Sequence, residues 1–438
     1  MLRIGASAVD ITPPVGTALD GYGGRLDVSL GIHDPLFARC LLLDDGVTQL
    51  ALVVCDLIGI GSFLAQRARE LIAERPGIPP ENVLVAATHT HAGPAGVRGS
   101  GEPVLVEEMA RKIAGAVRVA HRDAVEGVLK YGTTPLESIA QNRRHPDWPI
   151  DHRLDVLAAD TPAGKNIATL ARYACHPTTM TGANLEITAE WPGEACRLIE
   201  QITGGRGLYF NGACGNINPT WIEQRFDEVY RVGSIVGAKT AALSQEMRPL
   251  GINHQAANIR WDEFTDKPIS AGRLVGESAL RAVSRTVQMP YRSGGSDSDM
   301  AALVARLEAE LRMAVDPDAR RAVSAGLTAA RMERVALMRT RDKGPFRGEE
   351  VQAFRLGEGL FAICLPGEVF VETQEEIRQR SGLKDLLVIT YANDYPGYFC
   401  RPEAVAQGGY EAGVTPFAPE ADGILIETAV SVLREVSA

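Results

Sequence analysis

The chain has 438 residues, of which 45% are hydrophobic and 23% are charged, so it can form a large buried core. Its formal net charge of −10 argues against nucleic acid or an anionic membrane surface as a partner. The longest apolar run, residues 50–60, is interrupted by Asp56 and is far too short to span a membrane. We therefore expect a globular protein, residues 1–438 forming a single domain, with no nucleic acid and no stable membrane attachment.

Two features of the sequence bear on the compartment in which the protein works. The first residues, Met1-Leu2-Arg3-Ile4-Gly5, lack the charged start, the apolar stretch and the cleavage site of a signal peptide. The seven cysteines are odd in number and include no Cys-x-x-Cys pair, which fits a reducing compartment. We therefore expect a cytoplasmic location.

Predicted strands and helices alternate through most of the chain. Apolar residues that recur on one face predict helices at residues 62–74, 104–122 and 227–245. Apolar runs bounded by turn residues predict strands at residues 83–87, 167–174, 208–211, 350–355, 360–365 and 386–391. Ser62 stands at the start of the first helix, where it can act as the N-cap. This order predicts an α/β fold with a mixed β-sheet core flanked by helices.

The composition shifts between residues 262 and 342. Two segments in this range, 301–313 and 318–340, are long, charged and rich in Ala, Arg and Glu. We expect them to form a helical hairpin that is inserted on the outside of the core. We favour packing, or contact between copies of the chain, as the role of this hairpin over that of a substrate lid. A homo-oligomer is therefore possible.

Three predicted strands end directly before side chains that can bind a metal. His89 and His91 follow the predicted strand at residues 83–87, His176 follows the one at residues 167–174, and Glu368 follows the one at residues 360–365. Open α/β sheets place their ligand sites at the carboxyl ends of strands. Two neutral imidazoles and a carboxylate suit a catalytic zinc that keeps one position open for water. The same three donors also describe the ligand set of non-haem iron enzymes.

These motifs also carry a family resemblance over nearly the whole chain. The chain resembles the catalytic domain of the neutral/alkaline non-lysosomal ceramidases, which are zinc amidases. The motifs are Gly5-Ala6-Ser7-Ala8-Val9-Asp10-Ile11-Thr12-Pro13-Pro14, Thr88-His89-Thr90-His91-Ala92-Gly93-Pro94, Asn142-Arg143, Ala174-Cys175-His176-Pro177-Thr178, Pro366-Gly367-Glu368, Asn393-Asp394-Tyr395-Pro396-Gly397-Tyr398 and Gln407-Gly408-Gly409-Tyr410-Glu411.

The resemblance implies a zinc ion (Zn2+) and a set of site residues. The implied zinc ligands are His89, His176, Glu368 and Tyr398. Three further residues are implied to line the site, namely His91, Arg143 and Tyr410. In the mechanism that we expect, zinc-bound hydroxide attacks an amide carbonyl. Arg143 and Tyr410 then stabilise the oxyanion, and His91 gives a proton to the leaving amine.

The chain departs from the family pattern at three places. The family usually has Gly-Asp-Val-Ser-Pro where this chain has Gly215-Asn216-Ile217-Asn218-Pro219, and it has an aspartate where this chain has Glu190. The immunoglobulin-like domain of the ceramidases has no counterpart in these 438 residues. We therefore expect an amide substrate, a polar or short N-acylated small molecule or lipid, that is not long-chain ceramide; a role in sphingolipid metabolism is left open.

Other functions are compatible with the same residues. The zinc site could instead hydrolyse an ester or a lactone, the donor set could hold iron, and the fold could serve a non-catalytic binding protein. The metal that the protein carries and a screen of amides, esters and lactones separate these hypotheses. No Gly-x-Gly-x-x-Gly follows the first predicted strand, so we expect no dinucleotide cofactor.

Overall fold

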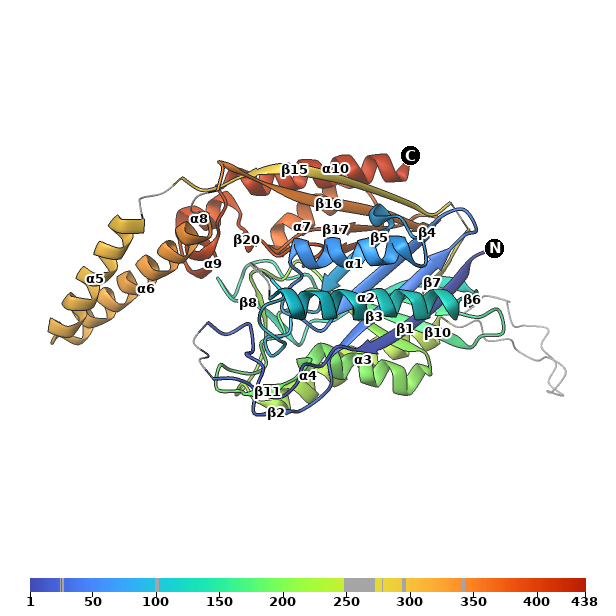
Figure 1. The fold of residues 1–438 in the computed structure, drawn as a ribbon, viewed down its shortest axis with the longest axis horizontal. Helices are drawn as coiled ribbons and strands as arrows, with labels where there is room; N and C mark the ends of the chain where they lie inside the picture. Colours follow the sequence, from blue (N-terminus) through green and yellow to red (C-terminus); the bar gives the residue numbers. More distant parts are fainter. Residues whose placement is uncertain are drawn as a thin grey trace.

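The computed structural model describes residues 1–23, 25, 27–98, 102–247, 272–277, 279–293, 297–340 and 343–438. In this part of the chain three main β-sheets meet around a central core, and helices cover the outer side of each sheet (Figure 1). The sheets mix parallel and antiparallel strands. The predicted α/β class, with mixed sheets flanked by helices, is confirmed.

The first sheet has the strand order β5-β4-β3-β1-β6. Its strands are β1 (Arg3–Asp10), β3 (Phe37–Asp44), β4 (Gln49–Cys55), β5 (Val83–Ala87) and β6 (Val125–Glu126). Strands β4 and β5 run parallel, whereas the other neighbours are antiparallel. The helices α1 (Ser62–Glu74) and α2 (Pro103–Arg122) pack on one another and bury their apolar faces with this sheet.

The second and third sheets follow the same plan. The second sheet, in the order β12-β10-β9-β7-β14, contains β7 (Val128–Pro135), β9 (Arg153–Asp160), β10 (Asn166–Tyr173), β12 (Arg206–Asn211) and β14 (Arg273–Val275), with helices α3 (Glu190–Thr203) and α4 (Phe226–Glu246). The third sheet, in the order β15-β16-β17-β19, contains β15 (Arg281–Pro290), β16 (Phe346–Gly357), β17 (Leu360–Cys364) and β19 (Asp385–Ile389), with helices α7 (Val371–Ser381) and α10 (Glu420–Ser437).

Each sheet contains the same unit of three strands and one helix. The first strand pairs antiparallel with the second, and the second pairs in parallel with the third, which follows the connecting helix. The three units are β3-β4-α1-β5, β9-β10-α3-β12 and β16-β17-α7-β19. The carboxyl ends of a parallel pair lie at the same edge of the sheet, which is where such folds bind ligands. Each unit therefore brings two strand ends to one edge.

The strands are apolar on both faces because each lies between two cores. In β3, Leu41 and Leu43 face the core that the three sheets share, whereas Cys40 and Leu42 face the core beneath α1 and α2. This double burial explains why the strands appear in the sequence as continuous apolar runs. All seven cysteines are buried and free.

The remaining elements are short or lie outside the three sheets. Three two-stranded pairs are β2 (Gly31–Ile32) with β11 (Glu186–Ile187), β8 (Ala140–Asn142) with β13 (Ile217–Pro219), and β18 (Glu368–Val369) with β20 (Tyr398–Phe399). The short helices are η1 (Pro80–Asn82), α8 (Pro402–Gln407) and α9 (Tyr410–Val414). Among the described residues, no helix combines the length and the apolar character that a membrane-spanning segment needs.

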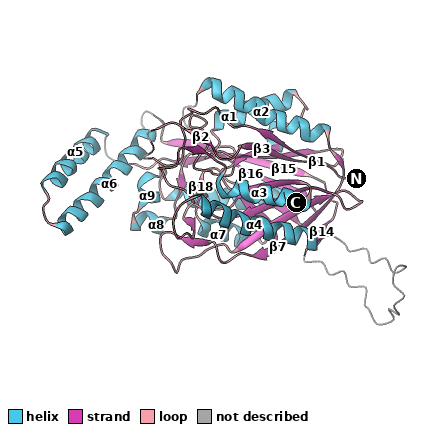
Figure 2. Ribbon diagram, turned by 90° about the horizontal axis from the view of Figure 1, so that it is seen from below, coloured by secondary structure: helices cyan, strands magenta, loops and turns pink. Residues whose placement is uncertain are grey.

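Two long helices, α5 (Asp297–Met313) and α6 (Pro317–Thr340), pack on one another and project from the body (Figures 1 and 2). Their small apolar core is separate from the cores of the sheets. Strands β14 and β15 also fall within residues 262–342 and belong to the sheets, so the helical pair is narrower than that range. Residues 262–271 of the predicted insertion lie outside the described residues.

The prediction that Ser62 caps α1 was wrong. Ser62 is the first helical residue, and the N-cap position is Gly61. The backbone N–H of Ser62 donates instead to Oδ1 of Asp394 at 3.0 Å. A carboxylate that is remote in the sequence thus satisfies a free helix N–H, in a position that also suits the helix dipole.

Candidate metal centre

Three histidines and a glutamate meet where the strands end. His89 and His91 follow β5, and His176 follows β10. Their ligand nitrogens all lie within 4.8 Å of one another, and all three side chains are buried. Glu368, at the end of the turn after β17, places Oε2 3.1 Å from Nε2 of His176 and 3.7 Å from Nε2 of His89. The structure thus brings together side chains that the sequence could only assign to separate strand ends.

Backbone carbonyls orient the three imidazole rings. Nδ1 of His89 lies 2.6 Å from the carbonyl oxygen of Ile58, and Nδ1 of His91 lies 3.0 Å from that of His89. Nδ1 of His176 lies 2.6 Å from the carbonyl oxygen of Cys214. A carbonyl oxygen can only accept, so each Nδ1 carries a proton, which leaves the Nε2 atoms of the neutral His89 and His91 rings with a lone pair, whereas Nε2 of His176 faces the Glu368 carboxylate at 3.1 Å. This is the tautomer that outer hydrogen bonds commonly impose on metal-binding histidines.

These residues fit a metal ion. Nε2 of His89 is buried and has no hydrogen-bond partner among the described residues. Such an atom is costly to bury unless something occupies its lone pair. Imidazole nitrogens together with a carboxylate are donors typical of zinc sites. His91 meets the geometric requirement for a ligand as well as His89 and His176 do, although the sequence assigns it to proton transfer.

The charge states also suit a cation. Burial lowers the pKa of His89 to about 3, so this ring is neutral. Burial alone would raise the pKa of Glu368, but interactions with His89 and His176 hold it well below its usual range. Burial alone would lower the pKa of His176, whereas Cys214 and Glu368 raise it to about 9. The pocket therefore pairs an ionised carboxylate with imidazoles and attracts positive charge to Nε2 of His176.

His89 and Tyr391 have unusual backbone conformations. Their φ angles are 73° and 56°, in the left-handed region that non-glycine residues rarely adopt. Each is the second residue after a strand, β5 for His89 and β19 for Tyr391. Their rings stack with centroids 4.1 Å apart. Such conformations cost on the order of 1–3 kcal/mol each and are concentrated at functional sites, because the surrounding structure must hold them.

Tyr398 and Arg143 form the adjoining side of the site. Pairing of β18 with β20 sets Tyr398 beside Glu368. Nη2 of Arg143 donates to the Tyr398 hydroxyl at 3.1 Å, and Nε donates to Oε1 of Glu411 at 2.7 Å. Burial raises the pKa of the Tyr398 phenol well above its ordinary value. Coordination of a metal by Tyr398 would therefore require the ion to offset the cost of ionising that phenol.

Tyr410 lies on the outer side of this group. Its ring centroid is 5.9 Å from that of Tyr398 and 5.7 Å from the Arg143 guanidinium carbon. Half of Tyr410 is exposed (50%), in contrast to the buried Tyr398. Tyr410 therefore stands between the site and the surface, which agrees with its expected place in the site wall.

Sequence reasoning missed two residues that contact the site. The hydroxyl of Tyr395 donates to Oε1 of Glu368. The guanidinium of Arg98 lies 5.0 Å above the Tyr395 ring and pairs with Asp20 at 2.6 Å. Tyr395 lies inside the motif that ends at Tyr398, which was the available signal. Nothing in the sequence around Arg98 indicates its position.

Glu190, one of the departures from the family pattern, supports the histidine loop. Its carboxylate accepts the backbone N–H of His91 at 2.9 Å and that of Thr179 at 3.1 Å. Burial raises the pKa of Glu190 to about 7. Glu190 thus fixes the backbone at His91 and acts on that ring only through its position.

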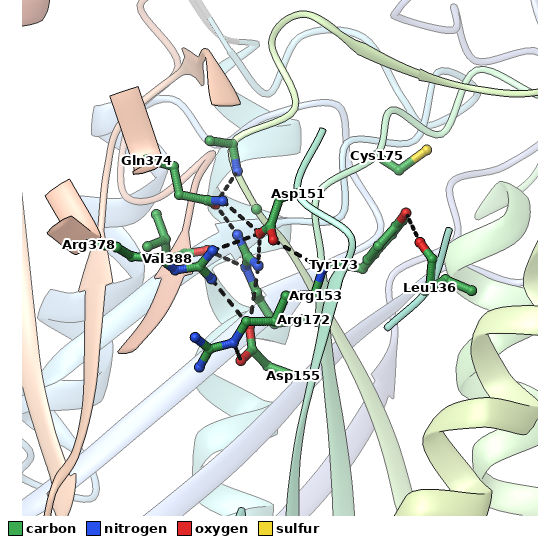
Figure 3. A network of polar contacts seen from close by, with 12 residues as sticks. Leu136, Asp151, Arg153, Asp155, Arg172, Tyr173, Cys175, Gln374, Arg378 and Val388 are labelled. Atoms are coloured by element: carbon green, nitrogen blue, oxygen red, sulfur yellow. Dashed lines mark hydrogen bonds and ion pairs between the residues drawn. The ribbon is translucent and has the colours of Figure 1, made fainter. Parts of the chain in front are cut away.

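The loop that carries Cys214 rests on a buried polar network (Figure 3). Nη1 of Arg172 lies 2.7 Å from Oδ2 of Asp151, and Nε donates to the carbonyl oxygen of Val388 at 2.8 Å. Gln374 accepts from Arg172 and also from the backbone N–H of Ala213 at 3.2 Å. The network therefore joins the second sheet to the third directly behind the loop that orients His176.

Asn216 and Asn218 in this loop have different roles. The side-chain nitrogen of Asn216 donates to Glu372 at 2.9 Å, and its oxygen accepts the N–H of Val371 at 3.1 Å. Asn216 is buried and fixes the loop on α7. Oδ1 of Asn218 accepts from Nη1 of Arg143 at 3.4 Å, so the side-chain amide of Asn218 is the one that faces the site.

The fold and this cluster define an α/β protein with a buried candidate metal centre. Residues 2–213 match the family model described as neutral/alkaline non-lysosomal ceramidase, N-terminal. Neutral ceramidase from Pseudomonas aeruginosa is 24% identical over 95% of this chain and 69% of its own length. The Mycobacterium tuberculosis neutral ceramidase is 25% identical over 95% and 74%.

A solved structure has the same fold. The crystal structure of neutral ceramidase from Pseudomonas aeruginosa matches with a TM-score of 0.74 and 21% identity, over 100% of this chain and 74% of that one. The resemblance seen in the sequence is confirmed, because residues 2–213 match the N-terminal model of the neutral/alkaline non-lysosomal ceramidases and two neutral ceramidases are similar over 95% of this chain. The name of these relatives denotes hydrolysis of the amide bond of ceramide.

Proposed function

We propose that the protein is a zinc-dependent hydrolase that cleaves the amide bond of an N-acylated substrate. The observation that carries this proposal is the cluster of three buried imidazoles, each with Nδ1 on a backbone carbonyl, two of which also lie against the carboxylate of Glu368. The relatives support the choice of bond, because they are neutral ceramidases and ceramide is an amide.

In this proposal His89, His176, Glu368 and Tyr398 hold the ion. A bound zinc would lower the pKa of a water molecule toward neutrality and polarise the substrate carbonyl. The protein holds the ligands in place through Ile58 and the loop at Cys214, so little rearrangement is needed when the substrate binds.

The other site residues handle protons and negative charge. Burial lowers the pKa of His91 well below its ordinary value, so the ring is neutral at rest. In this proposal it accepts the proton that the attacking water releases and passes it to the leaving amine. Arg143 is fixed by Glu411 and by the carbonyl of Gly215 at 2.7 Å, which fixes its position before negative charge develops. Tyr410, whose ring lies beside Arg143, can donate a further hydrogen bond from the exposed side of this group.

We further propose that the natural substrate is not long-chain ceramide. The support for this is the change from a hydroxyl-bearing residue in the family motif to Asn218, whose amide contacts Arg143. An amide at this position offers both a donor and an acceptor to a polar substrate. A cytoplasmic location and the oligomeric state stay predictions.

The test combines metal analysis with a substrate screen. Protein purified without added metal should contain one zinc per chain and should hydrolyse short N-acyl amines and N-acyl amino acids with higher kcat/KM than long-chain ceramide in detergent. Stoichiometric iron, or cleavage of esters and lactones without any amide, would refute the amidase proposal. A preference for long-chain ceramide would refute only the substrate assignment.

A further inference from the structure

A large cavity lies beside Tyr410, outside the metal centre. Its volume is about 1060 Å³, and helix α6 forms one side while α8, α9 and the turn between them form the other. Figures 1 and 2 show that the α5–α6 pair projects from the body next to these short helices. Small-molecule pockets usually measure about 300–1,000 Å³, so this cavity can hold a sizeable organic ligand.

The wall of this cavity is apolar. Leu311 of α5, Met332 of α6 and Val405 of α8 line it together with Ala329 and Ala412, and Met332 and Val405 pack against one apolar cluster. The α6 and α9 helices approach closely, because a Cβ atom at Gly413 would lie 3.2 Å from Cβ of Met332. An alkyl chain placed in this cavity would lose contact with water over much of its length, which is favourable at about 25 cal/mol per Å².

The rim of the cavity is positively charged. Three arginines line it, Arg292, Arg320 and Arg321, against a single acid, Glu333. Nη1 of Arg292 donates to the carbonyl oxygen of Ala412 at 3.1 Å, and Nη2 lies 3.6 Å from Oε1 of Glu333. Arg292 and Glu333 thus pair with one another, and Arg320 is a further, exposed cation of the lining on α6. Arginine is the side chain best suited to bind carboxylate and related oxyanions.

Tyr410 connects the cavity with the metal centre. Its half-exposed ring lines the cavity and also contacts Tyr398 and Arg143. A substrate whose amide reaches the centre past Tyr410 can therefore extend its far end into the cavity.

We infer that this cavity binds the end of the substrate farthest from the scissile amide, and that this end is an apolar chain that bears an anionic oxygen group. The inference rests on the proposed function, since it names the class of N-acylated substrate that the same site accepts. It assigns specificity to helix α6, and Arg320 is the residue that selects negative charge.

The first test measures binding without hydrolysis. Decanesulfonate has the anionic group and the chain but no bond that the enzyme can cleave, and decanol is its neutral counterpart. We expect calorimetry on the metal-loaded protein to show at least tenfold tighter binding of decanesulfonate than of decanol. Arg320→Glu should weaken decanesulfonate binding at least tenfold and leave decanol unchanged, whereas Met332→Asp should weaken both.

A matched control is Arg306→Glu, on α5 of the same helical pair. Arg306 is exposed and pairs with Glu310 at 3.5 Å, outside the cavity lining. This variant should bind both ligands within about twofold of the parent protein. Equal binding of decanesulfonate by the parent and Arg320→Glu would overturn the inference, as would an equal loss in Arg306→Glu.

The second test separates this inference from the proposed function. N-butanoyl-10-aminodecanoic acid and the monobutylamide of decanedioic acid carry the charge at the far end of the amine side and of the acyl side, and each is compared with its neutral carboxamide. At least one acidic substrate should have tenfold higher kcat/KM than its neutral partner, and Arg320→Glu should remove that difference. If neutral amides are cleaved without any preference for charge, only the cavity assignment fails. If no amide is cleaved, the proposed function fails, and the binding test still decides the role of the cavity.

Discussion

The hydroxyl of Tyr395 holds Glu368 in the geometry that a metal needs, and the substitution Tyr395→Phe tests this directly. The change deletes one oxygen atom and keeps the ring, which stacks with Tyr391 at 6.2 Å and lies beneath Arg98. Oε1 of Glu368 then loses the donor that the structure gives it. A charged oxygen left unpaired in a buried site costs about 1–3 kcal/mol.

The expected effect on metal affinity follows from the same contact. Loss of an outer partner of a metal ligand typically lowers affinity or activity by about 10–100-fold. The hydrogen bond from Tyr395 also helps to keep the pKa of Glu368 low, after the larger effects of His89 and His176. Its removal raises that pKa, so as pH falls the variant should lose metal at a higher pH than the parent protein does.

The measurement is a zinc competition titration against a chromophoric chelator at several pH values. Tyr230→Phe is the control, because the hydroxyl of Tyr230 lies 2.9 Å from Nε2 of His33, a histidine outside the metal cluster. Zinc affinity of Tyr395→Phe within twofold of the parent across the pH range would refute the reasoning that this hydroxyl supports the metal centre.

Three further predictions address the ligands, the supporting network and the pH dependence. His89→Ala should lose both zinc and activity, whereas His91→Ala should keep zinc and lose most turnover. His145→Ala is the control, because His145 is half exposed and lies outside the cluster. Loss of zinc from His91→Ala alone would reverse the assignment of the two histidines. Arg172→Met should lower the free energy of unfolding by about 1–3 kcal/mol in urea titrations, because buried oxygen atoms of Asp151, Gln374 and Val388 lose a donor, although Arg378 still pairs with Asp151 and Arg153 with Asp155; an unchanged free energy of unfolding would contradict this. Burial raises the pKa of Glu349 to about 8 from its ordinary 4.5, so the folded state favours the protonated form. Stability should therefore fall as pH rises from about 4.5 to about 8. Glu349→Gln should make this fall smaller, and an unchanged dependence of stability on pH would count against the prediction.

The strands that lead to the metal centre could be predicted closely because burial on both faces makes them continuous apolar runs, whereas β1, β3, β7 and β9 were not predicted. The predicted strand at residues 83–87 agrees with β5, and that at 167–174 is shifted by one residue from β10. Placing His89 and His176 at strand ends then required only the turn residues that follow. The convergence of these ends depends on how the three sheets pack, which no local pattern contains.

The residues that sequence reasoning missed act through contacts between distant segments. Asp394 caps α1 from the far end of the chain, and Arg98 reaches the ring of Tyr395. Such contacts leave no periodicity and no spacing signal in the sequence. Strand β15 was missed for another reason, since much of it is exposed and it lacks the apolar run of the central strands.

The repeated strand–helix–strand plan explains how the substrate pocket can vary while the metal centre stays the same. Each of His89, His176 and Glu368 is fixed by a parallel pair inside the sheets, so the segments between those pairs can change length without moving the ligands. The α5–α6 pair lies in such a segment, between β15 and β16. Because it borders Tyr410 but contributes none of the metal ligands, it is a place where substrate preference can change while the chemistry of the centre is retained.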